Sequence, residues 1–146
     1  MSRIALVCLL FSIVCDGTLR GEIAPLPKEL LEADATDVVV GTVKGIYTDS
    51  VKEDNWLKSA GVIEIEVSKV EKGNKLVPGD AVYVRFWKLG WIGSGDPPPF
   101  GSGHRIPKKG ENVRAYLEKK NGGYELLLPN GIEVIAKPQE VKTKPK

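Results

Sequence analysis

The chain has 146 residues, a formal net charge of +2 and a hydrophobic content of 42%. This length fits a single domain, and this composition fits a globular fold rather than a disordered chain. Because acidic and basic residues nearly balance, no strong field attracts nucleic acid or an anionic membrane, and we expect neither as a partner.

The N-terminus has the order of a secretory signal peptide. Arg3 provides a basic start, an apolar run extends from Ile4 to Val14, and small residues follow. The run is too short for a membrane span, which needs about 20 apolar residues. We therefore expect cleavage between Thr18 and Glu22, a secreted or periplasmic protein, and no stable membrane span afterwards. A lipid anchor on Cys15 is the alternative.

Cys8 and Cys15 are the two cysteines of the chain, and both lie in this segment. The mature chain therefore has no thiol for a disulfide, a metal site or a nucleophile. Residues 137–146 contain four lysines and two prolines, which indicates a solvated, disordered basic tail. The expected organisation is a signal peptide over 1–21, one β-barrel domain over 22–136 and the tail over 137–146.

The mature chain begins with a short helix and a long strand. Lys28 to Ala33 (KELLEA) contains good helix formers directly after a proline, which predicts the helix. Asp37 to Tyr47 (DVVVGTVKGIY) predicts the strand. Its two interior glycines, Gly41 and Gly45, indicate the bend or bulge by which a sheet curls into a barrel.

The next segment, Thr48 to Ala60, is polar and predicts a loop. It contains Trp56 and Leu57, large apolar residues that a solvated loop would leave exposed. We expect these two side chains to fold the loop back over the barrel.

Two strands with strict alternation follow and form an antiparallel pair. Apolar Ile63, Ile65 and Val67 alternate with Glu64, Glu66 and Ser68, and apolar Val82, Val84 and Phe86 alternate with Tyr83, Arg85 and Trp87. This period of two indicates one buried and one solvated face. The residues expected in the core are Val39, Ile65, Val67, Val84 and Leu117.

The rest of the chain comprises a long loop and three strands. Leu89 to Gly110 is rich in glycine and proline, which predicts an irregular loop. We expect Trp91 and Phe100 to fold over the barrel, and Gly93 to Gly103 to stay mobile until a partner binds. Turn sequences then separate three short strands and predict a meander; these strands are Asn112 to Lys119, Tyr124 to Leu128 and Ile132 to Ile135.

The expected fold is mostly β, a small antiparallel OB-like barrel of five or six strands with a short N-terminal helix and a long irregular loop. An SH3-like barrel or a small sandwich is the alternative. Ala33-Asp34, Asp37 to Val43, Val67 to Gly73 and Gly79-Asp80 resemble the opening strands of secreted netrin-like domains and of the tissue inhibitors of metalloproteinases. The resemblance implies an OB fold. Those inhibitors reach the protease metal through an N-terminal cysteine, which this mature chain lacks, so it does not imply inhibition.

No catalytic, cofactor or metal site is expected. The single histidine, His104, lies in the glycine-proline loop and predicts a solvated side chain rather than a base for Ser102 or Asp96. Glu64 and Glu66 share one strand face at a separation that glycosidase carboxylates can have. A wet strand face explains them better, so a glycan-directed hydrolase is only the alternative function.

Aromatic and basic side chains gather on the second strand of the pair and in the loop after it. Such a surface stacks rings, and because export argues against nucleic acid, an extracytoplasmic protein or a polysaccharide is the expected partner. The alternative is that the tryptophans only cover the barrel. The sequence thus favours a non-enzymatic exported binding or scaffolding module, whose candidate ligand-binding residues are Tyr83, Arg85, Trp87, Trp91, Phe100 and Arg105.

Overall fold

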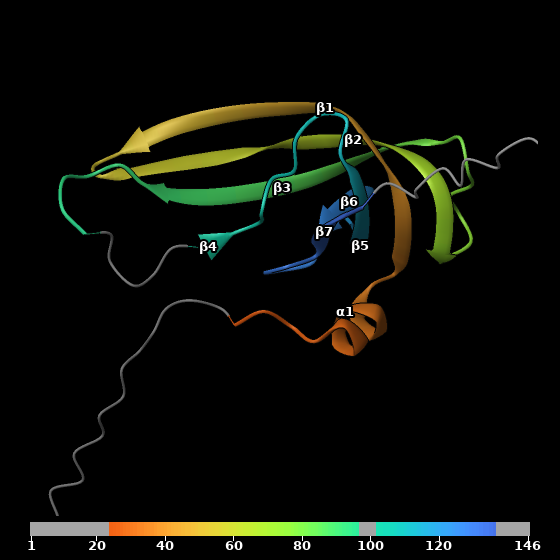
Figure 1. The fold of residues 1–146 in the computed structure, drawn as a ribbon. Helices are drawn as coiled ribbons and strands as arrows, with labels where there is room; N and C mark the ends of the chain where they lie inside the picture. Colours follow the sequence, from red (N-terminus) through yellow and green to blue (C-terminus); the bar gives the residue numbers. More distant parts are fainter. Residues whose placement is uncertain (1–23, 97–101, 137–146) are drawn as a thin grey trace, which may run out of the picture.

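The computed structural model describes residues 24–96 and 102–136 (Figure 1). In this part of the chain one short helix, α1 (Lys28–Asp34), precedes seven strands. The strands are β1 (Asp37–Glu53), β2 (Trp56–Lys72), β3 (Ala81–Trp91), β4 (Ser102–Gly103), β5 (Asn112–Lys120), β6 (Gly123–Leu126) and β7 (Ile132–Ile135). The expected signal peptide and basic tail, and Phe100, lie outside the described residues.

Five strands close a barrel in the order β1-β2-β3-β6-β5, with β5 returning to β1. The mostly β barrel with a short N-terminal helix is confirmed, and its closure excludes the sandwich. The prediction that all its strands are antiparallel is wrong, because β3 and β6 pair in parallel, with Val84 opposite Tyr124 and Arg85 opposite Glu125. A ring of five strands cannot alternate direction at every contact, so one parallel contact is required.

The predicted meander of the last three strands is also wrong. β6 and β7 both pair with β5, along different parts of the edge that faces away from β1. Between them, the Gly131 N–H donates to the Leu127 carbonyl and the Tyr116 N–H donates to the Gly131 carbonyl. The turn at 127–131 is therefore a bulge that returns the chain to β5, and β7 remains outside the barrel.

The core consists of the inward-facing residues of the five barrel strands. All five residues predicted for it are buried, with at most 1% of their surface exposed. Gly41 and Gly45 each adjoin a shift in the register between β1 and β2, so the predicted bends are confirmed. A second apolar cluster joins α1 to the barrel through Leu31, which packs with Val38 and Tyr116.

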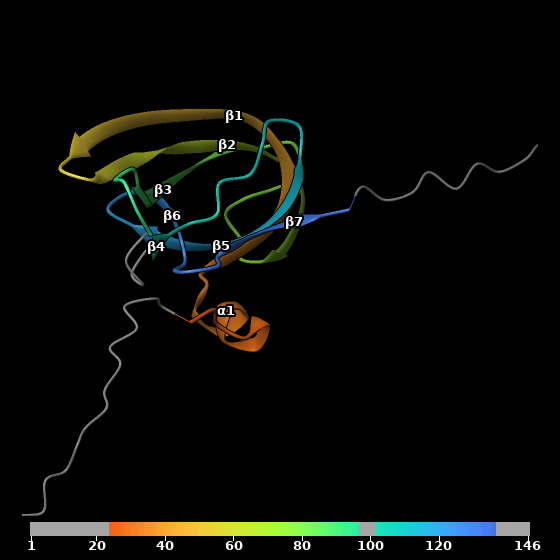
Figure 2. The same ribbon diagram turned by 60° about the vertical axis from the view of Figure 1, so that its left-hand side comes forward.

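A three-stranded arm extends past the barrel (Figures 1 and 2). It comprises residues 47–61 of the β1–β2 hairpin and residues 87–91 of β3. The predicted loop over 48–60 is therefore wrong, since pairing continues to Glu53 and Trp56 across a two-residue turn. Asp54 occupies the left-handed region there, with φ of 52°. Solvent reaches much of the arm, so its residues lack the apolar period that identifies a half-buried strand.

The long irregular loop is shorter than predicted. β3 continues through Leu89 to Trp91, and the short strand β4 pairs with its free edge, Gly103 opposite Lys88. The predicted loop mobility concerns a range whose centre, 97–101, lies outside the described residues. In the described ranges, the one helix is too short to cross a membrane.

Candidate binding surface on strand β3

The outer face of β3 presents two exposed aromatic rings. Val84 and Phe86 face the core and are buried, so alternation directs Tyr83, Arg85 and Trp87 outward. Tyr83 is 54% exposed and Trp87 is 39% exposed. The structure therefore brings three of the six candidate residues to one face.

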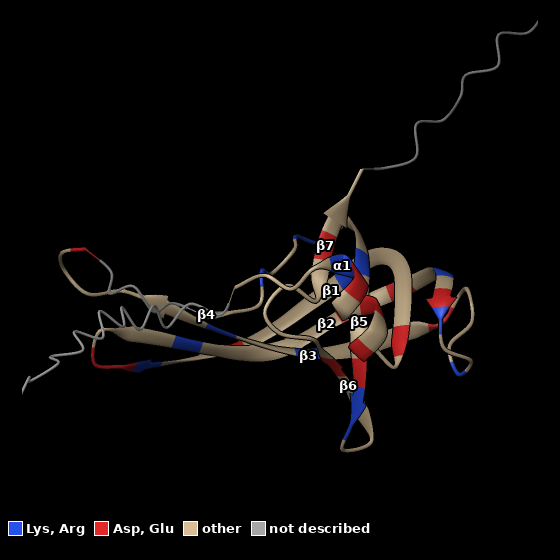
Figure 3. Ribbon diagram, turned by 90° about the horizontal axis from the view of Figure 1, so that it is seen from below, with Lys and Arg blue, Asp and Glu red and all other residues tan. Residues whose placement is uncertain are grey.

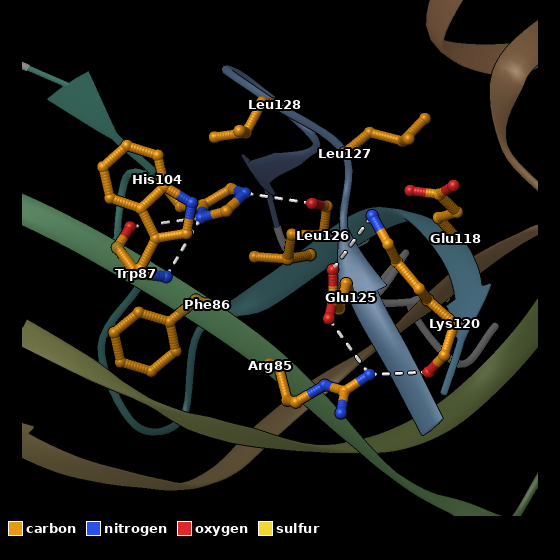
Figure 4. Close-up of a pocket in the computed structure, with 10 residues that line it drawn as sticks. All are labelled: Arg85, Phe86, Trp87, His104, Glu118, Lys120, Glu125, Leu126, Leu127 and Leu128. Atoms are coloured by element: carbon orange, nitrogen blue, oxygen red, sulfur yellow. Dashed lines mark hydrogen bonds and ion pairs between the residues drawn. The ribbon is translucent and has the colours of Figure 1, made fainter. Parts of the chain in front are cut away.

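Trp87 stands between two hollows. The first, which we call the β3–β6 hollow, has a volume of about 320 Å³ and is bordered by β3, β6, the end of β5 and His104 (Figure 4). The second, the arm hollow, has about 420 Å³ and is lined by Val51, Ala60 and Leu89. Trp87 lines both. Trp87 is therefore in a position to contact a ligand in either hollow.

The β3–β6 hollow has a charged side opposite Trp87. Arg85 Nη2 lies 3.0 Å from a carboxylate oxygen of Glu125 and donates to the Lys120 carbonyl at 2.6 Å. The Lys120 ammonium lies 4.0 Å from Glu125. Glu118 faces Glu125 across the β5–β6 pair, and within the described chain its carboxylate has no hydrogen-bond or ion-pair partner. The hollow therefore combines an aromatic wall with both donors and acceptors.

The prediction of a solvated His104 is wrong. His104 is only 3% exposed, and its Nε2 lies 3.0 Å from the Leu126 carbonyl, so Nε2 carries the proton and donates it. Its Nδ1 then accepts the Trp87 N–H at 3.2 Å. The imidazole thereby joins β3 to β6 and holds the backbone of Trp87. Its ring also makes an edge contact with the indole, at 6.2 Å between centroids.

Burial lowers the pKa of His104 below its ordinary value of 6.5, although the carbonyls of Leu126 and Trp87 act in the opposite direction. The unfolded chain therefore takes up the proton more readily than the folded chain. We expect the free energy of unfolding to be highest above pH 6.5 and to fall as the pH decreases from 6.5 towards the folded pKa, by at most about 1.4 kcal/mol per pH unit.

Urea unfolding between pH 5.5 and 7.5 measures this slope, and NMR titration of the imidazole measures the folded pKa. His104 is the only histidine, so the NMR signal is unambiguous. A folded pKa at or above 6.5, or a flat unfolding free energy over this range, would contradict the expectation.

The other candidate residues lie elsewhere. Trp91 packs edge-on against Trp56, with ring centroids 5.1 Å apart, at the tip of the arm. The prediction that Trp56 and Trp91 fold over the barrel is therefore wrong; the two rings pair with each other because β2 and β3 continue in register beyond the core. Arg105 is exposed and lines a separate hollow with Leu26 and Tyr116, beside α1.

The strand carboxylates have partners on the exposed sheet. Glu64 accepts a hydrogen bond from the Tyr47 hydroxyl at 2.8 Å, and Glu66 pairs with the Lys44 ammonium at 2.8 Å. Among the described residues, no three histidine, cysteine, aspartate or glutamate side chains gather in a way that could hold a metal ion.

Sequence reasoning missed the four other polar residues of the β3–β6 hollow, which are His104, Glu118, Lys120 and Glu125. The turn at 121–122 indicates that Glu118 faces Glu125, because it fixes the hairpin register. Nothing in the alternation of β6 indicates that it lies beside β3. The parallel contact joins segments distant in sequence, and it is this contact that assembles the hollow.

Basic and acidic residues are interspersed around β5 and β6, so neither positive nor negative charge dominates this side of the barrel (Figure 3).

In comparisons with known proteins, no family model, curated protein or solved structure matches the chain. The candidate site is therefore defined by its geometry.

Proposed function

We propose that the chain is an exported, non-enzymatic β-barrel that binds an extracytoplasmic macromolecule through the outer face of β3. The observation that carries this proposal is Trp87, an exposed aromatic residue whose backbone is held by a buried histidine and which lines two hollows. Secretion or export to the periplasm rests on the signal-peptide pattern of residues 1–21.

A binding role explains Trp87 better than a covering role. The neighbouring Phe86 already fills the core and is 3% exposed, whereas 39% of the Trp87 surface remains accessible. Large aromatic side chains that stay exposed beside polar groups are typical of recognition surfaces. Pre-positioning by His104 also reduces the entropy lost when a ligand fixes the ring.

The barrel topology supports the OB-type fold within this proposal. Its strand order, with one parallel contact between the third and the last barrel strand, matches a five-stranded Greek-key barrel. The resemblance to netrin-like domains agrees with that topology. It contributes a fold and no activity, because fold alone does not determine function.

Binding is favoured over the alternative of a glycan hydrolase. The carboxylates of that alternative, Glu64 and Glu66, lie on an exposed sheet face and are engaged by Tyr47 and Lys44. A glycosidase acid needs a raised pKa, which burial away from cations provides. Glu66 is instead exposed and paired with a cation, the Lys44 ammonium, and Glu64 lies beside it on the same strand face.

A capture experiment tests the proposed function. The immobilised mature chain is exposed to an extract of the producing cells' envelope and medium, and the retained protein and carbohydrate are quantified. Trp87→Ala should reduce the retained material, since one stacked ring contributes about 1–3 kcal/mol. The matched control is Tyr47→Ala, because Tyr47 is an exposed aromatic residue on the same sheet but is not among the residues that line the β3–β6 hollow.

Both variants should keep the parent's unfolding midpoint. Equal retention by Trp87→Ala and the parent would contradict the proposal, as would an equal loss with Tyr47→Ala.

A further inference from the structure

Building on the proposed binding role of β3, we infer that the β3–β6 hollow binds one ring of an uncharged glycan chain stacked on Trp87. The hollow has about 320 Å³, which lies within the range of small-ligand sites. Figure 4 shows the indole on one side and Glu118 and Lys120 on the other. His104 and Leu126 lie between these two sides in the same view, so a glycan chain with one ring on the indole would extend past them towards the polar side.

The charges of the hollow favour an uncharged ligand. Its two basic residues, Arg85 and Lys120, are matched by its two acidic residues, Glu118 and Glu125. Burial lowers the pKa of His104 and so disfavours the charged form of its imidazole. A nucleic acid or another polyanion would meet two carboxylates, and a cation would meet a guanidinium and an ammonium. Neither sign of charge is attracted strongly.

The donors and acceptors that remain suit hydroxyl groups. The Lys120 side chain is 54% exposed and its ammonium can donate, and the Glu118 carboxylate, which has no partner among the described residues, can accept. A sugar hydroxyl does both at once. The C–H face of a sugar ring is apolar and covers an indole, so a glycan chain can stack one ring on Trp87 and present the hydroxyls of a neighbouring ring to the polar side.

A peptide added as an extra strand does not fit beside Trp87. The Trp87 N–H donates to His104 Nδ1, and its carbonyl accepts the His104 N–H at 2.9 Å. On either side, β3 pairs with β6 at Arg85 and with β4 at Lys88. Strand addition requires free backbone groups on an edge, and this edge is occupied. Recognition here depends on side chains.

The first test repeats the capture with treated extracts. Periodate cleaves vicinal diols of sugars and should abolish the Trp87-dependent retention, once excess reagent has been quenched, whereas digestion of the extract with protease should leave that retention unchanged. Retention that survives periodate and is lost after proteolysis would overturn the glycan proposal while leaving the binding role of β3 intact. If no retention depends on Trp87, both proposals fail.

The second test measures purified probes by affinity electrophoresis. The mature chain is run through gels containing hydroxyethyl cellulose, xylan, galactomannan or dextran, with polygalacturonate and heparin as anionic comparisons. We expect retardation by a neutral polymer. Trp87→Ala should weaken it about tenfold to a hundredfold, and Glu118→Ala about threefold to tenfold. Tyr47→Ala should match the parent. Retardation only by the anionic polymers, or equal retardation of Trp87→Ala and the parent, overturns the inference.

Discussion

Replacing Ile65 by alanine should lower the free energy of unfolding by about 2–5 kcal/mol. Ile65 is fully buried and lies opposite Val43 on β1 and Val82 on β3, so it contacts the core from the centre of three strands. Truncation removes apolar contacts and leaves a cavity. The strands of a closed barrel cannot move inward far enough to fill it. Urea unfolding followed by tryptophan fluorescence measures the change.

Two control substitutions make this result specific to the core. Ile65→Val removes one methylene group and should cost about 0.5–1.5 kcal/mol. Val51→Ala, on the exposed arm, should stay within about 0.5 kcal/mol of the parent, because 55% of the Val51 surface is already exposed. An unfolding midpoint unmoved by Ile65→Ala would mean that the inward face of β2 is assigned wrongly.

The alternation of apolar residues was sufficient to identify this core from the sequence. Ile65 and Val84 are fully buried as predicted. In a strand with one solvated face, apolar and polar residues alternate with a period of two, which differs from the period of a helix. The same period placed Tyr83 and Trp87 on the outer face, where the structure has them. Where a strand packs on one side only, its sequence determines which residues face the core.

Features that depend on contacts distant in sequence could not be predicted. The arm is solvated and lacks an apolar period, so Thr48 to Ala60 was interpreted as a loop although it continues two strands. His104 lies in a glycine-proline segment, and its burial depends on contacts with Trp87 of β3 and Leu126 of β6. The hollow beside Trp87 depends on the same parallel contact, which turn sequences and alternation do not encode.

Gly41→Ala should destabilise the barrel by about 3 kcal/mol, although it adds a single methyl group. Gly41 lies in β1 between Val67 of β2 and Val113 of β5, where the strand bends to close the ring. A Cβ atom there would lie 2.3 Å from the Glu66 carbonyl oxygen and 2.7 Å from Ile65 Cγ2. Backbone atoms cannot turn aside as a flexible side chain can, so β1 and β2 must separate and lose core contacts.

The control for Gly41→Ala is Gly90→Ala, the same substitution in a strand of the arm. A Cβ atom added at Gly90 would lie 3.9 Å from its nearest neighbour, the Leu57 carbonyl oxygen, which is an ordinary contact distance. This variant should be as stable as the parent or gain about 0.4–1 kcal/mol, because alanine restricts the unfolded chain. Urea unfolding of both variants measures the difference. If Gly41→Ala is as stable as Gly90→Ala, β1 does not approach β2 closely at the bend, and the closure of the barrel must be achieved differently.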